Sequence, residues 1–407
     1  MNAAELQDDK SAFAKVAAPC GYFGTCGGCS LQDVAYADQL ALKRQRLSRW
    51  LRELDPSVTV DIVGADDPWR YRNKAELSFG QLGRSGAAGV MMLGYHAAGS
   101  FWKVVDLDDC LLLPKPMVAL ARDVWGLANA TGLPAYQPRT RQGFFRHLVV
   151  RFSQAAGKAI ICVVTTRGER GVIERLAGAL MARHPELAGV YWGVNEKPSD
   201  IAAPDELVLI RGEPYLHDRI GPFTVQCHPF TFVQPSPVQA ERLYAALREW
   251  VTPSPEGIAW DLYCGVGVVG FYLASNFRTV YGIDIDPRNM EMARANAAAN
   301  GIANMQFQTG PAEDLLQNKR FWLQDAKPDV VVVDPPRSGL HERVIASLLA
   351  ARPKELAYIS CNAQAMVQDL KRLRTGFPRY RIRAVRAFDL FPHTPHLEVL
   401  ALLERSA

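Results

Sequence analysis

The sequence lacks the features of a membrane-spanning, secreted or disordered chain. No apolar run approaches the roughly 18 residues that span a bilayer, and the runs at 111–113 and 330–333 are short. The amino terminus, MNAAELQDDKSAFAK, has mixed charges and no apolar core like that of a signal peptide. Internal repeats and low-complexity stretches are also missing. We therefore expect a cytoplasmic protein with no membrane association.

The sequence also has no large excess of basic or of acidic residues. The balance of 46 basic against 42 acidic residues gives a net charge of +4, which is compatible with RNA binding but too small to predict it. With 48% hydrophobic and 22% charged residues, the composition is that of an ordinary globular protein. At about 150 residues per domain, the chain of 407 residues predicts two or three domains.

The eight cysteines do not form the pattern of a disulfide framework, which a cytosolic chain of this size would not use. Cys20, Cys26 and Cys29 fall within ten residues, and Cys110 follows 81 positions later. Four thiolates suit either structural zinc or an iron–sulfur cluster, and the spacing by itself does not choose between these and a chance grouping.

The first region, residues 1–54, is expected to hold a frayed tail over 1–19, the cysteine-rich segment and an amphipathic helix over 36–54. Helical spacing places four leucines on one face of that helix: Leu40, Leu47, Leu51 and Leu54. Four basic residues fall largely off that face: Lys43, Arg44, Arg46 and Arg49.

The second region, residues 55–224, predicts a central α+β domain that contacts RNA and supplies Cys110. Residues 58–113 alternate short apolar runs with Gly-rich turns, which is typical of strands. The other elements expected here are helices at 114–130 and 171–184 and strands at 147–153 and 158–165.

The third region, residues 225–407, alternates strands and helices in the manner of a parallel, doubly wound, Rossmann-like sheet. Its strongest motif is DLYCGVGVVGFYLA at 261–274, where an apolar strand leads into a Gly-X-Gly turn and a helix. Gly265 and Gly267 would let the backbone approach a ligand, and Gly270 would permit close helix packing. The glycine pattern by itself fits a dinucleotide dehydrogenase equally well.

The spacing of the following residues separates the two alternatives. Asp284 ends the next strand, 20 residues after Cys264, where a carboxylate can accept hydrogen bonds from ribose hydroxyls. A later strand ends in Asp334, followed by two prolines and Arg337. This layout resembles class I S-adenosylmethionine methyltransferases, with an α/β fold for another nucleotide as the alternative. Arg337 stands where amino-methylating enzymes place an aromatic residue, which disfavours that chemistry.

Cys361 follows the apolar strand ELAYIS, at the strand end where such sheets bind substrates. A lone cysteine is more often a small buried hydrophobe. In a methyltransferase, however, a thiolate can add to C6 of a pyrimidine and so activate C5. The C5 proton then needs a base, and Glu398, with His393 and His396 nearby, is the candidate.

With these motifs, the chain resembles the RNA uracil-C5 methyltransferases. The matching stretches are YRNKAELSF (71–79), FTFVQ (230–234), DLYCGVG, GIDID, VVVDPPRSGL, YISCN and FPHTPHLE, in the family's order. The resemblance implies that Cys361 is the nucleophile and Glu398 the general base. It also implies that Gln234, Tyr263, Asp284 and Asp334 line the S-adenosylmethionine site, which the turn glycines Gly265 and Gly267 are expected to share.

Two positions depart from the family pattern. The family commonly has Glu where Asp284 stands, and it often has Asn where Ser236 stands. The first departure keeps the carboxylate, while the second leaves the local cofactor contacts open.

The presence or absence of these cysteines distinguishes two branches of the family. Its 23S rRNA branch carries a 4Fe-4S cluster on an arrangement like Cys20, Cys26, Cys29 and Cys110, which the tRNA branch lacks. Within that branch, only 19 residues precede Cys20 here, too few for the TRAM barrel of the enzymes that modify uridine 1939. The chain is therefore most similar to enzymes that methylate uridine 747 of 23S rRNA. Uridine 1939 and the tRNA T-loop uridine are the alternative targets.

Two other classes of function fit less well. A non-enzymatic RNA-binding module would need Cys361 or Glu398 to be missing, and both are present. A DNA cytosine-C5 methyltransferase places its Pro-Cys nucleophile earlier in the chain, whereas Cys361 comes after Asp334.

Binding of a single-stranded rRNA loop is expected to use basic residues of the central region, because arginine pairs with phosphates while aromatic residues stack on splayed bases. The expected RNA contacts are Arg139, Arg141, Arg146 and Arg151, together with Arg72 and Lys74. The target uridine would have to flip out of its stack to reach Cys361. No obligate protein partner is expected.

Overall fold

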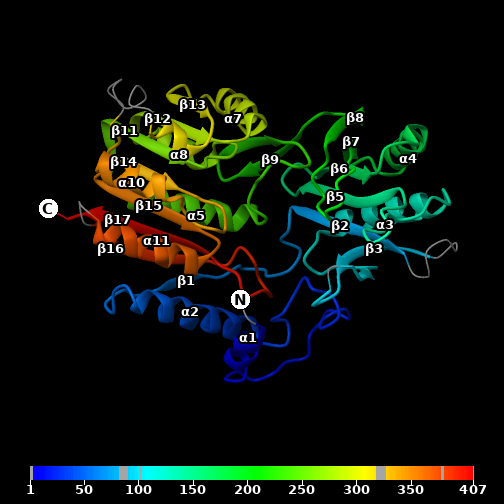
Figure 1. Cartoon of the computed structure of the whole chain (residues 1–407), viewed down its shortest axis with the longest axis horizontal. Helices are drawn as coiled ribbons and strands as arrows, with labels where there is room; N and C mark the ends of the chain where they lie inside the picture. Colours follow the sequence, from blue (N-terminus) through cyan, green and yellow to red (C-terminus); the bar gives the residue numbers. More distant parts are fainter. Residues whose placement is uncertain (1–2, 82–89, 101, 318–326, 377–379, 407) are drawn as a thin grey trace.

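The computed structural model describes residues 3–81, 90–100, 102–317, 327–376 and 380–406, with side chains from residue 6 onward. Its strands form two large sheets that lie side by side, each with its own helices (Figure 1). One sheet is built by the carboxyl-terminal part of the chain together with a short strand at residues 61–63, and residues 74–212 build the other.

The first sheet has the order β1-β16-β17-β15-β14-β11-β12-β13. Its strands are β1 (Asp61–Val63), β11 (Ser254–Leu262), β12 (Phe277–Asp284), β13 (Met305–Thr309), β14 (Val330–Val333), β15 (Glu355–Ser360), β16 (Tyr380–Phe388) and β17 (Glu398–Arg405). Neighbouring strands are parallel except at β17, which is antiparallel to both β15 and β16. The predicted doubly wound sheet is thus confirmed, with one reversed strand near its edge.

Helices cover both faces of this sheet. One face carries α5 (Pro237–Trp250), α6 (Val268–Ala274) and α7 (Pro287–Ala299). The other carries α2 (Tyr36–Arg52), α8 (Ala312–Leu315), α10 (Glu342–Ala351) and α11 (Ala363–Thr375). Strand β14 consists of four valines that are at most 2% exposed, as expected of a central parallel strand buried on both faces.

The second sheet has the order β4-β3-β2-β5-β6-β7-β8 and is antiparallel except between β6 and β7. Its strands are β2 (Lys74–Gln81), β3 (Met91–His96), β4 (Val104–Asp106), β5 (Phe145–Ser153), β6 (Lys158–Thr165), β7 (Leu187–Val194) and β8 (Glu206–Gly212). Helices α3 (Lys115–Asn129) and α4 (Arg170–Arg183) cover one face. These elements confirm the α+β prediction for the middle of the chain.

The two sheets share a hydrophobic core, so they do not form separate bodies. Val149 and Ile160, on the face of the second sheet opposite α3 and α4, belong to the same core as Leu243 of α5 and Phe271 of α6. A two-stranded ribbon of β9 (Leu216–Ile220) and β10 (Phe223–Cys227) contributes to this core as well.

The amino-terminal region differs from its prediction in two respects. The expected frayed tail contains helix α1 (Ala3–Lys10), where Asp9 pairs with Arg46 and Arg49 of α2. Lys43 and Arg46 are also buried, although helical spacing placed both off the apolar face. Their partners, Asp389 and Asp9, lie outside the helix, and periodicity within the helix carries no information about them.

Within the described residues, no helix has the length and apolar character needed to cross a membrane.

Candidate active site

The residues expected to carry chemistry lie at one edge of the first sheet. Tyr263 follows β11, Asp284 ends β12, Asp334 follows β14 and Cys361 follows β15. Because these strands are parallel, their carboxyl ends meet at the same edge. Glu398 begins the antiparallel strand β17, and the register places it next to the end of β15, where Ser360 pairs with Val399. Reversal of β17 therefore brings its first residue to the edge where the other strands end.

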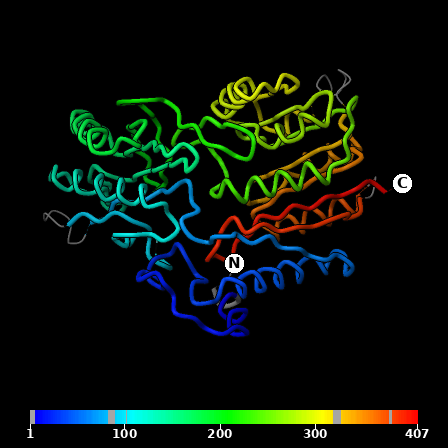
Figure 2. Tube along the Cα trace, turned by 180° about the vertical axis from the view of Figure 1, so that it is seen from behind, coloured from blue at the N-terminus to red at the C-terminus, as the bar shows by residue number. Residues whose placement is uncertain are grey.

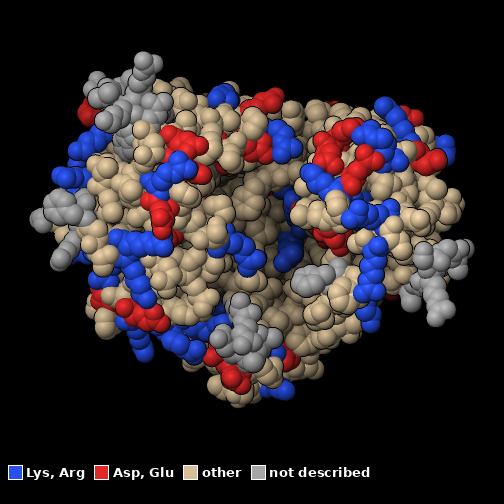
Figure 3. Space-filling view, in the orientation of Figure 1, with Lys and Arg blue, Asp and Glu red and all other residues tan. Residues whose placement is uncertain are grey.

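A cleft of about 690 Å³ opens between this edge and the second sheet, and it is the hollow at the centre of the molecule (Figure 3). Its walls include residues of both sheets: Arg72, Lys74, Tyr95, Phe230, Phe232, Gln234, Tyr263, Gly265, Asp284, Asn289, Asp334, Arg337, Cys361, Phe391 and Glu398. The expected nucleophile, base and ligand-binding residues thus line one cavity, except for Gly267, which is not among the residues that line it.

The glycine turn after β11 has the backbone geometry that its sequence predicts. Gly267 caps α6 with a φ of 90°, a left-handed conformation that favours glycine. Gly265 has a φ of 52°, and its amide donates to Oδ2 of Asp284 at 3.0 Å. Tyr263 has a φ of 65°, which is uncommon for a non-glycine residue and marks a constrained backbone beside the cleft.

A second pocket of about 520 Å³ adjoins the cleft and shares Tyr263 and Asp284 with it. Gly310 and Glu313 line its far side, which follows β13. The two cavities together form an elongated site along the strand ends, with the Asp284 carboxylate between them.

The carboxyl groups of the cleft are held in a low-dielectric environment. Burial raises the pKa of Glu398 well above its ordinary value, and the nearby Asp334 raises it further. Burial raises the pKa of Asp334 to about 7. Two acids this close cannot both ionise easily, so at least one of them keeps its proton near neutral pH.

Cys361 lies at the same end of the cleft, and burial raises the pKa of its thiol to about 11. The charge of Glu398 acts in the same direction, whereas the Arg337 guanidinium lowers the pKa. The backbone around Cys361 is fixed on both sides, because Ser360 Oγ donates to the Asn362 carbonyl at 3.0 Å and Asn362 Nδ2 donates to the Arg337 carbonyl at 2.7 Å.

The two histidines near Glu398 do not line the cleft. The His393 ring stacks on Trp69 with a centroid distance of 3.7 Å, and its Nδ1 is 3.2 Å from Gln39 Nε2. The Nδ1 of His396 is 3.3 Å from a guanidinium nitrogen of Arg337. Burial lowers the pKa of both rings to about 4. Glu398 is therefore better placed than either histidine to act as a base.

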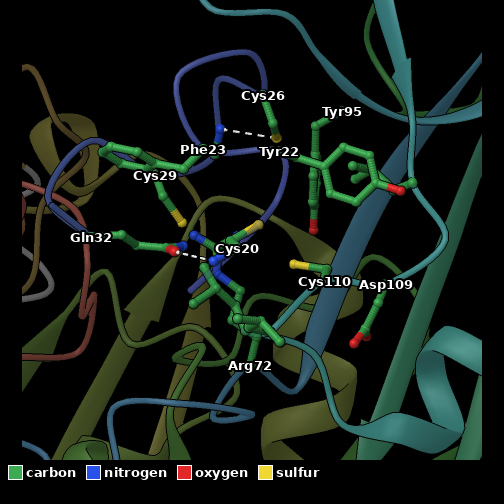
Figure 4. Close-up of a pocket in the computed structure, with 14 residues that line it drawn as sticks. Cys20, Tyr22, Phe23, Cys26, Cys29, Gln32, Arg72, Tyr95, Asp109 and Cys110 are labelled. Atoms are coloured by element: carbon green, nitrogen blue, oxygen red, sulfur yellow. Dashed lines mark hydrogen bonds between the residues drawn. The ribbon is translucent and has the colours of Figure 1, made fainter. Parts of the chain in front are cut away.

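The four cysteines of the expected cluster line one pocket (Figure 4). The amide of Cys20 donates to Gln32 Oε1 at 3.2 Å, and the amide of Gly28 donates to Cys26 Sγ at 3.4 Å. Burial raises the pKa of Cys29 to about 12 and also raises those of Cys26 and Cys110. Among the described residues, no three His, Cys, Asp or Glu side chains are grouped as ligands of one metal ion.

The predicted RNA-contacting residues separate into two sets. Arg72 and Lys74 line the cleft, while Arg139 and Arg141 are exposed near the turn before β5. The Arg139 guanidinium lies over the ring of Trp102, 5.0 Å from its centroid, and that ring is 64% exposed.

The other two arginines predicted to contact RNA, Arg146 and Arg151, are only 2% and 1% exposed. Arg146 donates to the carbonyls of Asn195 and Ser199, and Arg151 donates to that of Thr231. Both lie on β5, where every residue is buried. Their hydrogen bonds to these carbonyls hold the neighbouring loops in place.

Sequence reasoning missed several residues that line the cleft, among them Tyr95, Asn289 and Phe391. Phe391 lies within the FPHTPHLE motif, and Phe232, which is 62% exposed, lies within FTFVQ, so motif membership could have pointed to these two. No sequence signal marks Tyr95, which reaches the cleft only because β3 pairs with β2.

Comparison with known proteins agrees with this geometry. The model of a family described as tRNA (Uracil-5-)-methyltransferase matches residues 223–406. A protein of Halalkalibacterium halodurans described as an uncharacterized RNA methyltransferase is 32% identical over 96% of this chain and 84% of its own length. One of Listeria monocytogenes with the same description is 33% identical with the same coverage.

Among solved structures, the fold is similar to that of the Pyrococcus abyssi tRNA (uracil-54, C5)-methyltransferase in complex with S-adenosyl-L-homocysteine. The TM-score is 0.74 and the identity 28%, over 92% of this chain and 85% of that one. The fold and the cleft define a methyltransferase that depends on S-adenosylmethionine. The chain belongs to the RNA uracil-C5 methyltransferase family.

Proposed function

We propose that this protein methylates C5 of uridine 747 in 23S rRNA through a covalent adduct between Cys361 and C6 of the base. The observation that carries the proposal is the meeting of Cys361, Glu398 and Asp334 at one end of a cleft that also exposes basic side chains. A uracil that enters this end would have a thiol on one side and carboxyl groups beside it.

The chemistry follows from these groups. The Cys361 thiolate adds to C6, and the electron pair of the C5–C6 double bond forms an enolate with nucleophilic character at C5. S-adenosylmethionine bound in the cleft would supply the methyl group that C5 takes up, and its sulfur would keep the electron pair of the broken S–CH3 bond. Glu398 then removes the C5 proton, the double bond returns and the thiolate leaves. This last step needs Glu398 in its ionised form, and because burial raises the pKa of Glu398, that carboxylate is a stronger base than an exposed one.

The residues present fit S-adenosylmethionine, which supplies an electrophilic methyl group when bound. Gln234 is 3% exposed, and its Oε1 has no hydrogen-bond partner among the residues that the structure describes, so it can accept from the ammonium group of the methionine moiety. Asp284 would hold the ribose hydroxyls, and Gly265 leaves room for the backbone to approach the ligand. Tyr263 and Asp334 would complete the site.

We further propose that Cys20, Cys26, Cys29 and Cys110 hold a 4Fe-4S cluster. Their placement around one pocket supports this, as does the chemistry of four thiols. In such a cluster each iron takes one thiolate, so the four sulfur atoms need not surround a single ion. Zinc, which needs all four sulfur atoms around one ion, is the alternative.

The cysteines also favour 23S rRNA over tRNA, because the resemblance associates this set with the rRNA branch of the family. Arg72 and Lys74 inside the cleft and the exposed Arg139 and Arg141 would bind RNA phosphates. The alternative targets are uridine 1939 and the tRNA T-loop, the latter because the Pyrococcus relative is a tRNA (uracil-54, C5)-methyltransferase.

Replacement of Glu398 tests the proposed chemistry. In Glu398→Gln, Cys361 still attacks and a methyl group is still transferred, but the amide does not accept the C5 proton. A general base typically contributes about 10²–10⁴-fold, so turnover should fall by that factor. A methylated RNA–protein adduct that survives denaturant should accumulate, as measured by gel mobility and mass spectrometry.

Cys361→Ala is the matched control, and it should lose both methylation and adduct. If Glu398→Gln turns over at the wild-type rate, another group is the base. If an adduct forms in Cys361→Ala, another residue is the nucleophile.

A further inference from the structure

The loop between β16 and β17, residues 389–397, leads directly into the proposed base. Phe388 and Glu398, the residues on either side of the loop, pair with each other, so the sheet fixes both ends of the loop. Phe391 and Glu398 both line the cleft. The middle of the loop must be held by something other than the sheet, because the strand pairing stops at Phe388 and Glu398.

His393, in the middle of this loop, has its backbone held by the amino-terminal part of the chain. Its carbonyl accepts from the amides of Ser30 and Leu31, both at 3.0 Å, and its own amide donates to Gln39 Oε1 at 3.0 Å. Its φ is 66°, a strained conformation for a non-glycine residue that persists only where surrounding contacts enforce it. Stacking of its ring on Trp69 adds a further constraint.

The start of the loop is held by helix α2. Lys43 Nζ is 2.6 Å from Asp389 Oδ1, with both side chains fully buried, and it also donates to the Phe391 carbonyl at 3.2 Å. Tyr36 Oη donates to Asp389 Oδ2 at 3.0 Å. Separating a buried ion pair leaves an uncompensated buried charge, so this contact strongly opposes movement of the loop.

Residues 30–43 thus contact the loop through two backbone amides and three side chains, although none of them lines the cleft. Seen from behind, the amino-terminal segment in blue lies against the carboxyl-terminal strands in red (Figure 2). Ser30 directly follows Cys29, so the cysteine pocket and the loop are joined through adjacent residues of the backbone.

We propose that residues 30–43 act as a clamp that positions the 389–397 loop, and that His393 is the positioning residue through which the clamp sets the place of Glu398 relative to Cys361. This inference rests on the proposed function, because it takes Glu398 as the base. A small displacement of a catalytic group can reduce a rate by about a hundredfold, since proton transfer needs hydrogen-bond distance. RNA binding should change little, because the clamp does not reach the cleft.

The test compares Gln39→Met with wild type under steady-state and single-turnover conditions. The methionine keeps the volume of Gln39 but removes its hydrogen bonds to the His393 amide and to the Leu31 and Val34 carbonyls. We expect kcat to fall about ten- to a hundredfold, with KM for RNA changed less than about threefold. The methylated covalent adduct should accumulate, because proton removal is the slowed step. Amide hydrogen exchange in residues 389–397 should also become faster, with or without RNA.

A second pair of variants distinguishes loss of loop positioning from general loss of folding. Trp69→Leu removes the ring that stacks on His393, and Trp69→Phe retains an aromatic face, so the phenylalanine variant should recover most of the lost kcat. The control is Leu176→Ala, a cavity in the α4 core that does not touch the loop.

The outcomes separate the two proposals. If Gln39→Met or Trp69→Leu changes kcat and adduct no more than Leu176→Ala does, the clamp is refuted. If both variants bind RNA more weakly but keep the wild-type kcat, the clamp is refuted as well, because the segment then acts on binding. If the wild-type protein forms no adduct and Cys361→Ala still methylates, the proposed function fails instead.

Discussion

Glu398 and Asp334 place two carboxyl groups on one side of the cleft, where burial disfavours their ionised forms. Such an arrangement costs stability in the ligand-free protein, and it is retained where a function needs it. Arg337 is the cation whose charge reaches Cys361 and lowers the pKa of its thiol. A sulfonium group that binds in the cleft would place its positive charge beside these two acids.

The raised pKa of Glu398 predicts how the free energy of unfolding changes with pH. The folded protein keeps the Glu398 proton above the ordinary pKa of 4.5, whereas the unfolded chain releases it there. The unfolded state then binds fewer protons, so the free energy of unfolding falls as pH rises from about 4.5 toward the raised pKa. In Glu398→Gln this fall should be smaller, and the variant should gain at least about 1 kcal/mol over wild type between pH 5 and pH 8.

Urea denaturation of the ligand-free protein at both pH values measures this difference. The control is Glu404→Gln at the other end of β17, where the carboxylate is in a surface pair with Arg381 and contributes little. Parallel stability curves for wild type and Glu398→Gln would show that Glu398 ionises normally in the folded protein.

The segment between α1 and α2 contains the first three cysteines and has neither helix nor strand in residues 20–35. Contacts from other elements hold it in place. The Gly27 amide donates to the His96 carbonyl at the end of β3, and the Ala98 amide donates to the Thr25 carbonyl. Such a segment gains little from regular backbone hydrogen bonding, so a bound metal group would stabilise it considerably.

The proposed cluster can be tested on this segment directly. Anaerobically purified protein should be brown, with iron and sulfide near four each per chain, and Cys26→Ala should lose both. Cys162→Ala is the matched control, because Cys162 is buried in β6 away from the pocket, and it should keep the cluster. Stoichiometric zinc without sulfide would contradict the proposal and support the alternative.

The two sheets share one core and enclose the cleft between them, so a base that enters the cleft would lie between residues of both halves of the molecule. The first sheet supplies the proposed reactive groups, and the second supplies Arg72, Lys74 and Tyr95 from β2, β3 and the segment before them. On the proposed function, recognition of the target uridine would therefore depend on both sheets.

The substrate proposal is tested with the intact protein. With S-adenosylmethionine, it should methylate a 23S rRNA fragment that contains uridine 747 at least tenfold faster than tRNA or a fragment that contains uridine 1939. Mapping of 5-methyluridine in rRNA and tRNA from a strain that lacks the protein gives an independent measurement. Preferential methylation of the T-loop would overturn the assignment to rRNA.

Much of the architecture follows from local sequence patterns. The alternation of strands and helices predicted the parallel sheet, and it placed Asp284 and Cys361 at strand ends, where such sheets bind ligands; both residues line the cleft. These inferences succeed because hydrophobic period and motif spacing are properties of neighbouring residues, and because parallel strands end at a common edge.

Only the tertiary structure decided which charges are buried and what they contact. Lys43 looked like a solvent-facing residue, but it pairs with Asp389, a residue 346 positions away in the sequence. Arg146 and Arg151 were predicted to contact RNA, but both are buried and donate hydrogen bonds to backbone carbonyls. Burial and its partners depend on which distant segments meet, and that information is absent from any local pattern. The motifs thus identified the proposed reactive groups of this protein, and the packing determined which distant residues hold them in place.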